Sequence, residues 1–124
     1  MSKAALSYIS DTLTSLDIPY AFMEYESDTV PELYFVGEYS EPESPTREED
    51  GYQEISFILT GTSRSWLDLE NAKALIEANI TRTAILPNGN GIAVFYGGAM
   101  PVPTGDAELR RIQINLVIKE WSVN

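Results

Sequence analysis

Two segments in which apolar and polar residues alternate constrain the fold more than any other feature of this sequence. In residues 52–60, Ile55, Phe57 and Leu59 fall on one face of an extended chain. The second segment carries its apolar face on four residues: Ile112, Ile114, Leu116 and Ile118. Because successive side chains of a strand point to opposite faces, both segments predict strands with one buried face.

Two amphipathic segments predict helices that could cover this face. Residues 4–16 carry apolar residues at helical spacing, and Ser2 is their candidate N-cap. Residues 65–78 begin with Ser65 three positions before Asp68, which resembles a capping box. The expected apolar stripes are Leu6, Ile9, Leu13 and Leu16 in the first helix and Leu69, Ala72, Leu75 and Ile76 in the second.

Four shorter segments rich in aromatic and β-branched residues predict further strands. They lie at residues 20–25, 33–38, 81–86 and 92–96. Pro-Asn-Gly-Asn-Gly at 87–91 predicts a hairpin turn, and residues 97–106 are expected to form a loop. Strands thus occur in consecutive blocks. This order predicts one α+β domain over residues 1–124, with a mostly antiparallel sheet packed by two helices.

The negative charge is concentrated in one part of the chain. The net charge is −11, and residues 24–54 hold 11 of the 19 acidic residues and one of the eight basic residues. Such a segment repels phosphate backbones and anionic lipid surfaces. We therefore expect no specific nucleic-acid binding and no membrane association.

Within this part, residues from about 39 to 51 are predicted to form a long acidic loop, because prolines and few apolar side chains leave little surface to bury. Its candidate contact residues are Glu41, Glu43, Glu48, Glu49 and Asp50. Carboxylates can bind hard cations, but their spacing here lacks the EF-hand pattern, so no metal site is expected. The loop is either solvated or becomes ordered against a basic partner.

Histidine and cysteine are absent from the sequence. Their absence excludes a Ser-His-Asp triad, a cysteine nucleophile and zinc sites built on either residue. The glycine pairs Gly89/Gly91 and Gly97/Gly98 precede no Gly-Lys-Ser/Thr and are interpreted as turns rather than a phosphate cradle. No spacing selects a catalytic pair of carboxylates. We expect a protein without a catalytic site or cofactor.

Two tryptophans and three arginines are further candidate contact residues. Trp66 begins the second helix and Trp121 nearly ends the chain; tryptophan is common both in cores and at interfaces, so both interpretations stay open. Arg64, Arg110 and Arg111 are candidate partners for the acidic loop of a neighbouring copy. Surface solvation is the alternative interpretation of these arginines.

The whole chain resembles the tail-terminator (tail-completion) proteins of long-tailed bacteriophages. The resemblance lies in the order of elements: an amphipathic helix, a strand pair ending in LYFVGEY, a charged loop, YQEISFILTGTS, the helix WLDLENAKALIEA, a hairpin and the closing strand IQINLVIKEW. It covers nearly all 124 residues and includes no diagnostic motif.

The resemblance implies a structural role in the virion tail. Such proteins form hexameric rings that cap the tail tube, stop its polymerisation and present a surface to the head connector, and DNA passes through the ring. The expected partners are further copies of the chain, the tail-tube protein and the head-connector protein. A head-tail connector, tail-tube or minor capsid component is the first alternative, and an acidic inhibitor that mimics DNA is the second. Residues 1–17 predict neither a signal peptide nor a membrane span, which is typical of assembly in the host cytoplasm.

Overall fold

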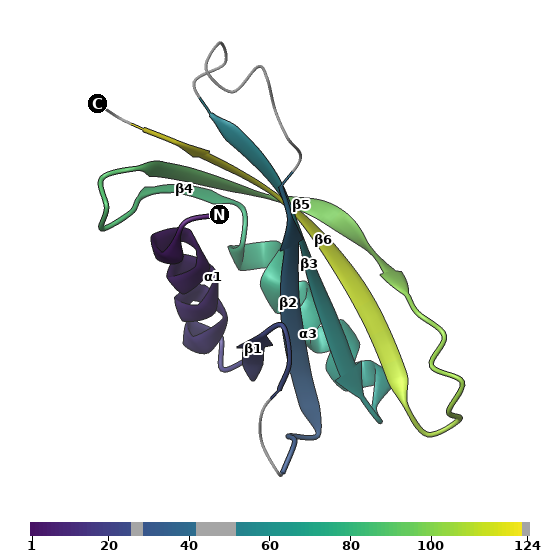
Figure 1. Ribbon diagram of the computed structural model, residues 1–124. Coiled ribbons are helices and arrows are strands. Elements are labelled where there is room, and N and C mark those ends of the chain that lie inside the picture. The colour runs from purple at the N-terminus through teal and green to yellow at the C-terminus, as the bar shows by residue number, and fades with distance from the viewer. Residues whose placement is uncertain (26–28, 42–51, 123–124) are drawn as a thin grey trace.

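The computed structural model describes residues 1–25, 29–41 and 52–122 as an α+β fold with two helices and one mixed, curled sheet (Figure 1). The helices are α1 (Lys3–Ser15) and α3 (Trp66–Asn79). The strands are β1 (Tyr20–Phe22), β2 (Leu33–Ser40), β3 (Gln53–Ser63), β4 (Arg82–Ile85), β5 (Gly91–Pro101) and β6 (Arg110–Trp121). None of the helices in the described residues is long and apolar enough to cross a membrane.

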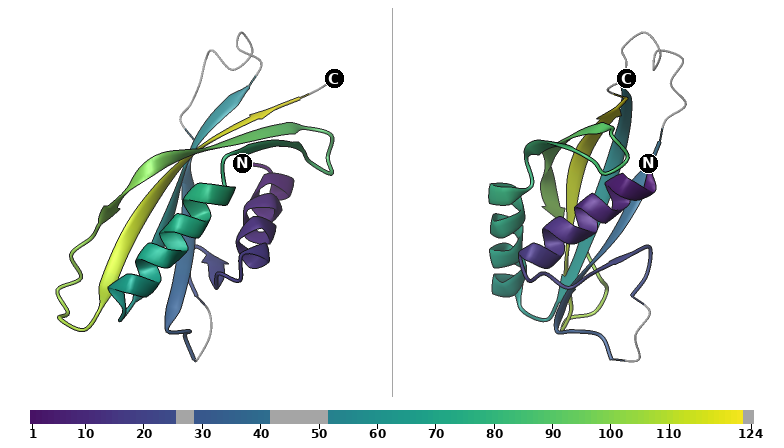
Figure 2. Two further views of the ribbon diagram at one scale, coloured as in Figure 1. Left: turned by 180° about the vertical axis from the view of Figure 1, so that it is seen from behind. Right: turned by 90° about the vertical axis from the view of Figure 1, so that its left-hand side faces the viewer.

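The sheet has the strand order β1-β2-β3-β6-β5-β4. Only β1 and β2 are parallel, and every other neighbouring pair is antiparallel. The two alternating segments became the central strands β3 and β6, which pair from Gln53↔Glu120 to Ser63↔Arg110. Both helices cover the same face of the sheet (Figure 2). The prediction of a mostly antiparallel sheet packed by two helices is confirmed.

The core lies between the helices and the sheet face that they cover. The alternation of apolar and polar residues in β3 and β6 explains why this face is apolar. The predicted inward residues of β3 and β6 are all buried: Ile55, Phe57, Leu59, Ile112, Ile114, Leu116 and Ile118. The other side of the same strands, called here the open face, is polar or half-exposed and includes Ser56, Thr60, Gln113 and Asn115. An antiparallel sheet commonly has one buried and one solvated face.

Side-chain caps fix where both helices begin. The Ser2 Oγ accepts a 3.1 Å hydrogen bond from the Ala5 N–H, and the Ser65 Oγ accepts one of 3.2 Å from the Asp68 N–H. Each bond satisfies an N–H group that the first turn of a helix leaves unpaired. Both predicted caps are confirmed. The first helix ends at Ser15.

Three predictions about extent were wrong. Residues 97–101, expected in a loop, belong to β5, because a bulge between Tyr96 and Ala99 lets the strand continue along β6 to Pro101. The strand expected at 20–25 ends at Phe22. Residues 39–40, expected to begin the acidic loop, belong to β2, where they pair with Phe57 and Ser56.

One predicted core residue lies outside the core. Leu75 is 45% exposed, while Leu69, Ala72 and Ile76 of the same expected stripe are buried. The stripe is narrower than predicted because Leu75 lies on the edge of the helix that turns away from the sheet. Glu43, Glu48, Glu49 and Asp50 of the predicted acidic loop lie outside the described residues.

Candidate contact surfaces at the two ends of the sheet

Four of the predicted contact residues are brought to one end of the sheet. Strand β3 ends at Ser63, which pairs with Arg110 at the start of β6 and with Leu33 at the start of β2. Arg64 follows Ser63 directly, Trp66 comes two residues after Arg64, and Arg111 follows Arg110. The register between β3 and β6 therefore places Arg64, Trp66, Arg110 and Arg111 together. We call this the arginine end.

A groove lies at the arginine end, between the start of α3 and the segment that connects β5 to β6. Its volume is about 520 Å³. Its lining includes Trp66, Pro101, Val102, Pro103, Arg110 and Arg111. The Trp66 side chain is 38% exposed. An aromatic and two prolines flanked by two guanidinium groups form a surface suited to an apolar group that also carries a carboxylate.

The segment from residue 102 to 109 forms one wall of this groove and is held by its own hydrogen bonds. The Thr104 hydroxyl donates to the carbonyl oxygens of Asp106 and Leu109 at 2.9 and 3.1 Å. The Asp106 Oδ1 accepts a 2.9 Å bond from the Glu108 N–H. The Val102 N–H donates to the Arg111 carbonyl oxygen at 3.0 Å, which continues the strand pairing beyond Pro101.

Arg110 and Arg111 form their side-chain hydrogen bonds with neutral oxygen atoms among the described residues. One terminal nitrogen of Arg110 donates to the Ala107 carbonyl oxygen at 2.7 Å, and the Arg111 Nε donates to Thr62 Oγ1 at 3.3 Å. The ion pairs of the described residues are Met1–Glu41 and Lys73–Glu70, neither of which includes an arginine. The remaining guanidinium donors are therefore available to a partner.

Acidic residues also lie at the arginine end, so the surface is mixed in charge. Asp106 lines the groove, and Glu32 and Arg64 line a neighbouring recess of about 220 Å³. Glu108 and Asp68 are exposed nearby in sequence. A surface of this kind differs from the basic patch that binds nucleic acid through many phosphate contacts.

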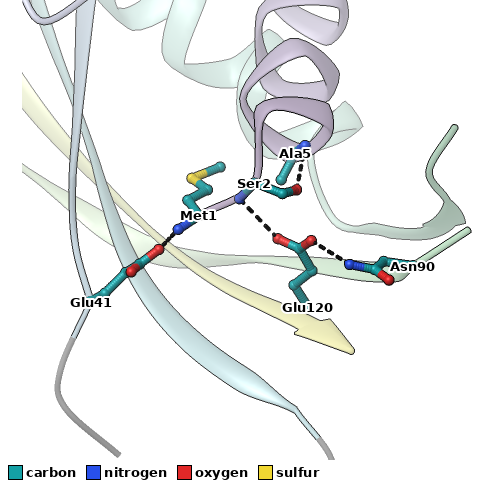
Figure 3. Close-up of polar contacts among 6 residues, drawn as sticks. All are labelled: Met1, Ser2, Ala5, Glu41, Asn90 and Glu120. Carbon is teal, nitrogen blue, oxygen red and sulfur yellow. Dashed lines mark hydrogen bonds and ion pairs between the residues drawn. The ribbon is translucent and has the colours of Figure 1, made fainter. Parts of the chain in front are cut away.

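The opposite end of the sheet carries buried and exposed carboxylates, and we call it the acidic end (Figure 3). Glu120 is 7% exposed; its Oε1 accepts a 3.3 Å bond from the Ser2 N–H and its Oε2 accepts a 2.9 Å bond from Asn90 Nδ2. The Met1 amino group forms an ion pair with Glu41, which is exposed just beyond β2. Burial raises the pKa of Glu120, but the bonds from Asn90 and Ser2 and the nearby amino group outweigh burial and lower it below its ordinary value.

Trp121 also lies at the acidic end, because it is the last residue of β6, whereas Trp66 lies at the arginine end. Its indole is half-buried and covers Gly91, its pairing partner in β5; a Cβ atom at Gly91 would overlap the indole ring. Trp121 thus packs on its own sheet, whereas Trp66 presents a partly exposed ring at the groove.

The sequence reasoning missed the network around Glu120. A usable signal was present, because Glu120 continues the even-numbered positions of the alternation that buries Ile112 to Ile118. A glutamate in that position must face the core side and needs donors there. Asn90, from the predicted hairpin turn, and Ser2, the predicted cap, supply them.

The described residues contain no group of three or more His, Cys, Asp or Glu side chains placed to hold a metal ion. Comparison with known proteins gives no family: no family model matches the chain, and no curated protein matches it significantly.

Proposed function

We propose that this chain is a structural subunit of a bacteriophage tail, a tail terminator that caps the tail tube as a ring and joins it to the head. The observation that carries the proposal is the difference between the two ends of the sheet. A ring requires heterologous contacts, in which one patch of each subunit meets a different patch of the next. The arginine end and the acidic end are two such patches on one sheet.

The arginines of one end and the carboxylates of the other are too far apart to form ion pairs within one molecule. Leu33, at the arginine end, and Glu41 are eight residues apart along β2. At about 3.3 Å per residue, they lie about 26 Å apart. The carboxylates of the acidic end could therefore reach Arg110 and Arg111 only in a neighbouring molecule.

The acidic end offers such carboxylates. Glu54 on β3 is exposed there, and so is Glu41 just beyond β2, where it is the partner of the Met1 amino group. The prediction of an acidic contact loop over residues 42–51 stays a prediction. The described residues that flank it, Glu41 and Tyr52, belong to the acidic end.

Passage of DNA through the ring fits the charge of the chain. A net charge of −11 gives the passing phosphates no attractive surface to bind. The proposal therefore includes a lumen without specific nucleic-acid contacts, and assembly into the virion tail inside the host cytoplasm.

Growth of tail tubes tests the function. Tail-tube protein from the same genome is polymerised with and without the chain, and tube lengths and ends are examined by electron microscopy. We expect rings at the tube ends and an arrest of growth. Tubes that lengthen equally in the presence of excess chain, with bare ends, would overturn the proposal.

A charge exchange tests the heterologous contact itself. Arg110→Glu with Arg111→Glu should abolish rings, as should Glu41→Arg with Glu54→Arg, and the variant with all four changes should regain them. Arg82→Glu, at an exposed arginine on the edge strand β4 that belongs to neither contact patch, is the matched control and should form rings normally. Thermal unfolding confirms that each variant is folded. Capping by the Arg110→Glu/Arg111→Glu variant at the wild-type level would exclude this contact while leaving the capping function intact.

A further inference from the structure

Two Asn-Gly pairs follow each other where the chain turns from β4 into β5. They are Asn88-Gly89 and Asn90-Gly91. An asparagine that precedes glycine is prone to spontaneous deamidation, because glycine has no side chain to shield its backbone nitrogen from the asparagine carboxamide. The two pairs are alike in sequence, but their surroundings in the structure differ.

The first pair, Asn88-Gly89, is open to this reaction. Asn88 is exposed, and a Cβ atom placed on Gly89 would meet nothing among the described residues within 4 Å, its chain neighbours apart. The Asn88 Oδ1 accepts a 3.0 Å hydrogen bond from the N–H of Asn90, two residues further along the chain. This bond folds the carboxamide over the intervening peptide, so that its carbon atom lies beside the Gly89 nitrogen.

The hydrogen bond to Asn88 Oδ1 also favours the chemistry. Attack by the Gly89 nitrogen places negative charge on this oxygen, toward which the Asn90 N–H already points. The Gly89 N–H donates to the Leu86 carbonyl oxygen at 2.9 Å, and this bond has to open before the attack. Opening one bond of an exposed turn requires little free energy.

The second pair, Asn90-Gly91, is closed to the reaction. Asn90 Nδ2 donates to Glu120 Oε2 at 2.9 Å (Figure 3). The Asn90 carbonyl oxygen accepts a 2.7 Å bond from the Leu86 N–H, and Gly91 is buried beneath the Trp121 indole. The carboxamide can reach the Gly91 nitrogen only after it leaves Glu120 and this end of the hairpin opens, which requires more free energy than opening the turn at Gly89.

We propose that Asn88 is a site of spontaneous deamidation in the folded protein and that the fold protects Asn90. The Gly89 nitrogen forms a bond to Asn88 Cγ, the bond from Cγ to Nδ2 breaks, and Nδ2 leaves as ammonia with the proton of the attacking nitrogen. Water then opens the succinimide ring: its hydroxyl joins a ring carbonyl carbon and its proton returns to the ring nitrogen. Opening at Cγ gives aspartate, and opening at the Asn88 backbone carbonyl carbon gives isoaspartate.

The reaction adds a carboxylate to the turn, so the net charge becomes more negative than −11. It needs water alone and uses no contact between subunits. It is therefore independent of the proposed tail function, and either proposal can fail without the other.

Incubation of the folded and the unfolded chain tests the proposal. The wild type is kept at mildly alkaline pH with and without denaturing urea, and samples are digested with trypsin. The peptide of residues 83–110 contains both pairs, and tandem mass spectrometry assigns the added carboxylate to Asn88 or Asn90, relative to a sample taken at the start.

In the folded chain, deamidation of Asn88 should be at least about tenfold faster than that of Asn90, because the opening that Asn90 needs lowers its rate exponentially. In urea the two rates should agree within about threefold, because neither pair is then protected. Similar rates in the folded chain, or an Asn88 that reacts only in urea, would overturn the proposal. The same large preference in urea would also overturn it, because the preference would then come from the sequence and not from the fold.

Asn88→Asp is the matched variant, because it removes the reactive amide and keeps a side-chain oxygen that can accept from the Asn90 N–H. Folded Asn88→Asp should gain no carboxylate during the time in which the folded wild type is converted, whereas in urea it should deamidate at Asn90 like the wild type. Circular dichroism checks its fold, and the wild-type comparison stands without it. A folded variant that reacts at Asn90 as fast as the folded wild type reacts at Asn88 would refute the protection of Asn90.

Discussion

Asn90 Nδ2 lies 2.9 Å from Glu120 Oε2 and donates a hydrogen bond to a carboxylate that is almost fully buried. The bond joins the turn between β4 and β5 to the C-terminal end of β6. Through its other oxygen, Glu120 also accepts from the backbone of Ser2, the cap of α1. One side chain thus connects three segments that are distant in sequence.

Glu120→Gln should therefore destabilise the fold at neutral pH and change its response to acid. Because the folded pKa is lowered, the unfolded chain binds more protons as the pH falls through this range. The contribution of Glu120 is fully present above about pH 5 and is lost as the pH falls through the lowered pKa. We expect Glu120→Gln to cost about 1–3 kcal/mol at pH 7 and the two stability curves to converge at low pH.

Urea unfolding between pH 3 and 7 measures this difference. Glu54→Gln, at an exposed glutamate on the neighbouring strand, is the control and should stay within about 0.5 kcal/mol of the wild type at pH 7. A constant gap between the wild type and Glu120→Gln over the whole pH range would contradict the assignment.

The Tyr20 hydroxyl should give the free energy of unfolding the opposite pH dependence, at alkaline pH. Burial raises the pKa of its hydroxyl from 10.0 to about 12. Since the folded state disfavours the tyrosinate, this contribution is complete below about pH 10 and declines as the pH rises toward 12. Tyr20→Phe should lose less stability than the wild type between these values. Chemical unfolding at pH 9, 10 and 11 is the measurement, with Tyr25→Phe as the control. Parallel curves for the wild type and Tyr20→Phe would show that Tyr20 ionises as readily folded as unfolded.

Two neighbouring residues of α3 mark the edge of its buried stripe. Ile76 is fully buried, and Leu75 is 45% exposed. Ile76→Ala should cost about 2–5 kcal/mol, because it removes three buried carbon atoms and leaves a cavity. Leu75→Ala should cost less than about 1 kcal/mol at concentrations where the chain is monomeric. Denaturant unfolding at micromolar concentration measures the loss of stability in each variant. Equal losses would mean that Leu75 is packed in the core like Ile76.

Local sequence signals predicted the elements that depend on local physics. The alternation in β3 and β6 and the caps at Ser2 and Ser65 followed from side-chain periodicity and from unpaired N–H groups, and the structure confirms them. The width of the buried stripe of α3 could not be predicted in this way. Periodicity alone does not show how the helix is rotated against a curled sheet, which decides whether Leu75 is buried. The length of β5 depends on β6, which supplies pairing partners as far as Pro101.

The composition of the candidate surfaces could be predicted only in part. Trp66, Arg110 and Arg111 were chosen singly, for exposure and charge. Their position at one groove depends on the register Ser63↔Arg110, which joins segments 47 residues apart. This register cannot be predicted from either segment alone. Trp121 lies far from Trp66 because it ends β6, whose 12 residues run from the arginine end to the acidic end, whereas Trp66 begins α3 at the arginine end.

Gly61 on β3 offers a test of how tightly the sheet packs beneath the helices. A Cβ atom at Gly61 would lie 2.5 Å from the Phe35 ring, its pairing partner on β2, and Phe35 is fully buried. Gly61→Ala should therefore destabilise the fold by about 1–3 kcal/mol, because the ring has to move within a close-packed core. Phe35→Leu alone should also destabilise it, through the cavity it leaves.

Combining the two changes is the decisive measurement. In Gly61→Ala/Phe35→Leu the added methyl group fills part of the space that the ring vacates, so the double variant should lose less stability than the sum of the single losses. We expect a favourable coupling of about 0.5–3 kcal/mol in a double-mutant cycle from urea unfolding. Ala107→Ser, in the exposed segment between β5 and β6, combined with Phe35→Leu is the control pair and should be additive. Additive losses for Gly61→Ala and Phe35→Leu would mean that the ring of Phe35 does not occupy the space above Gly61.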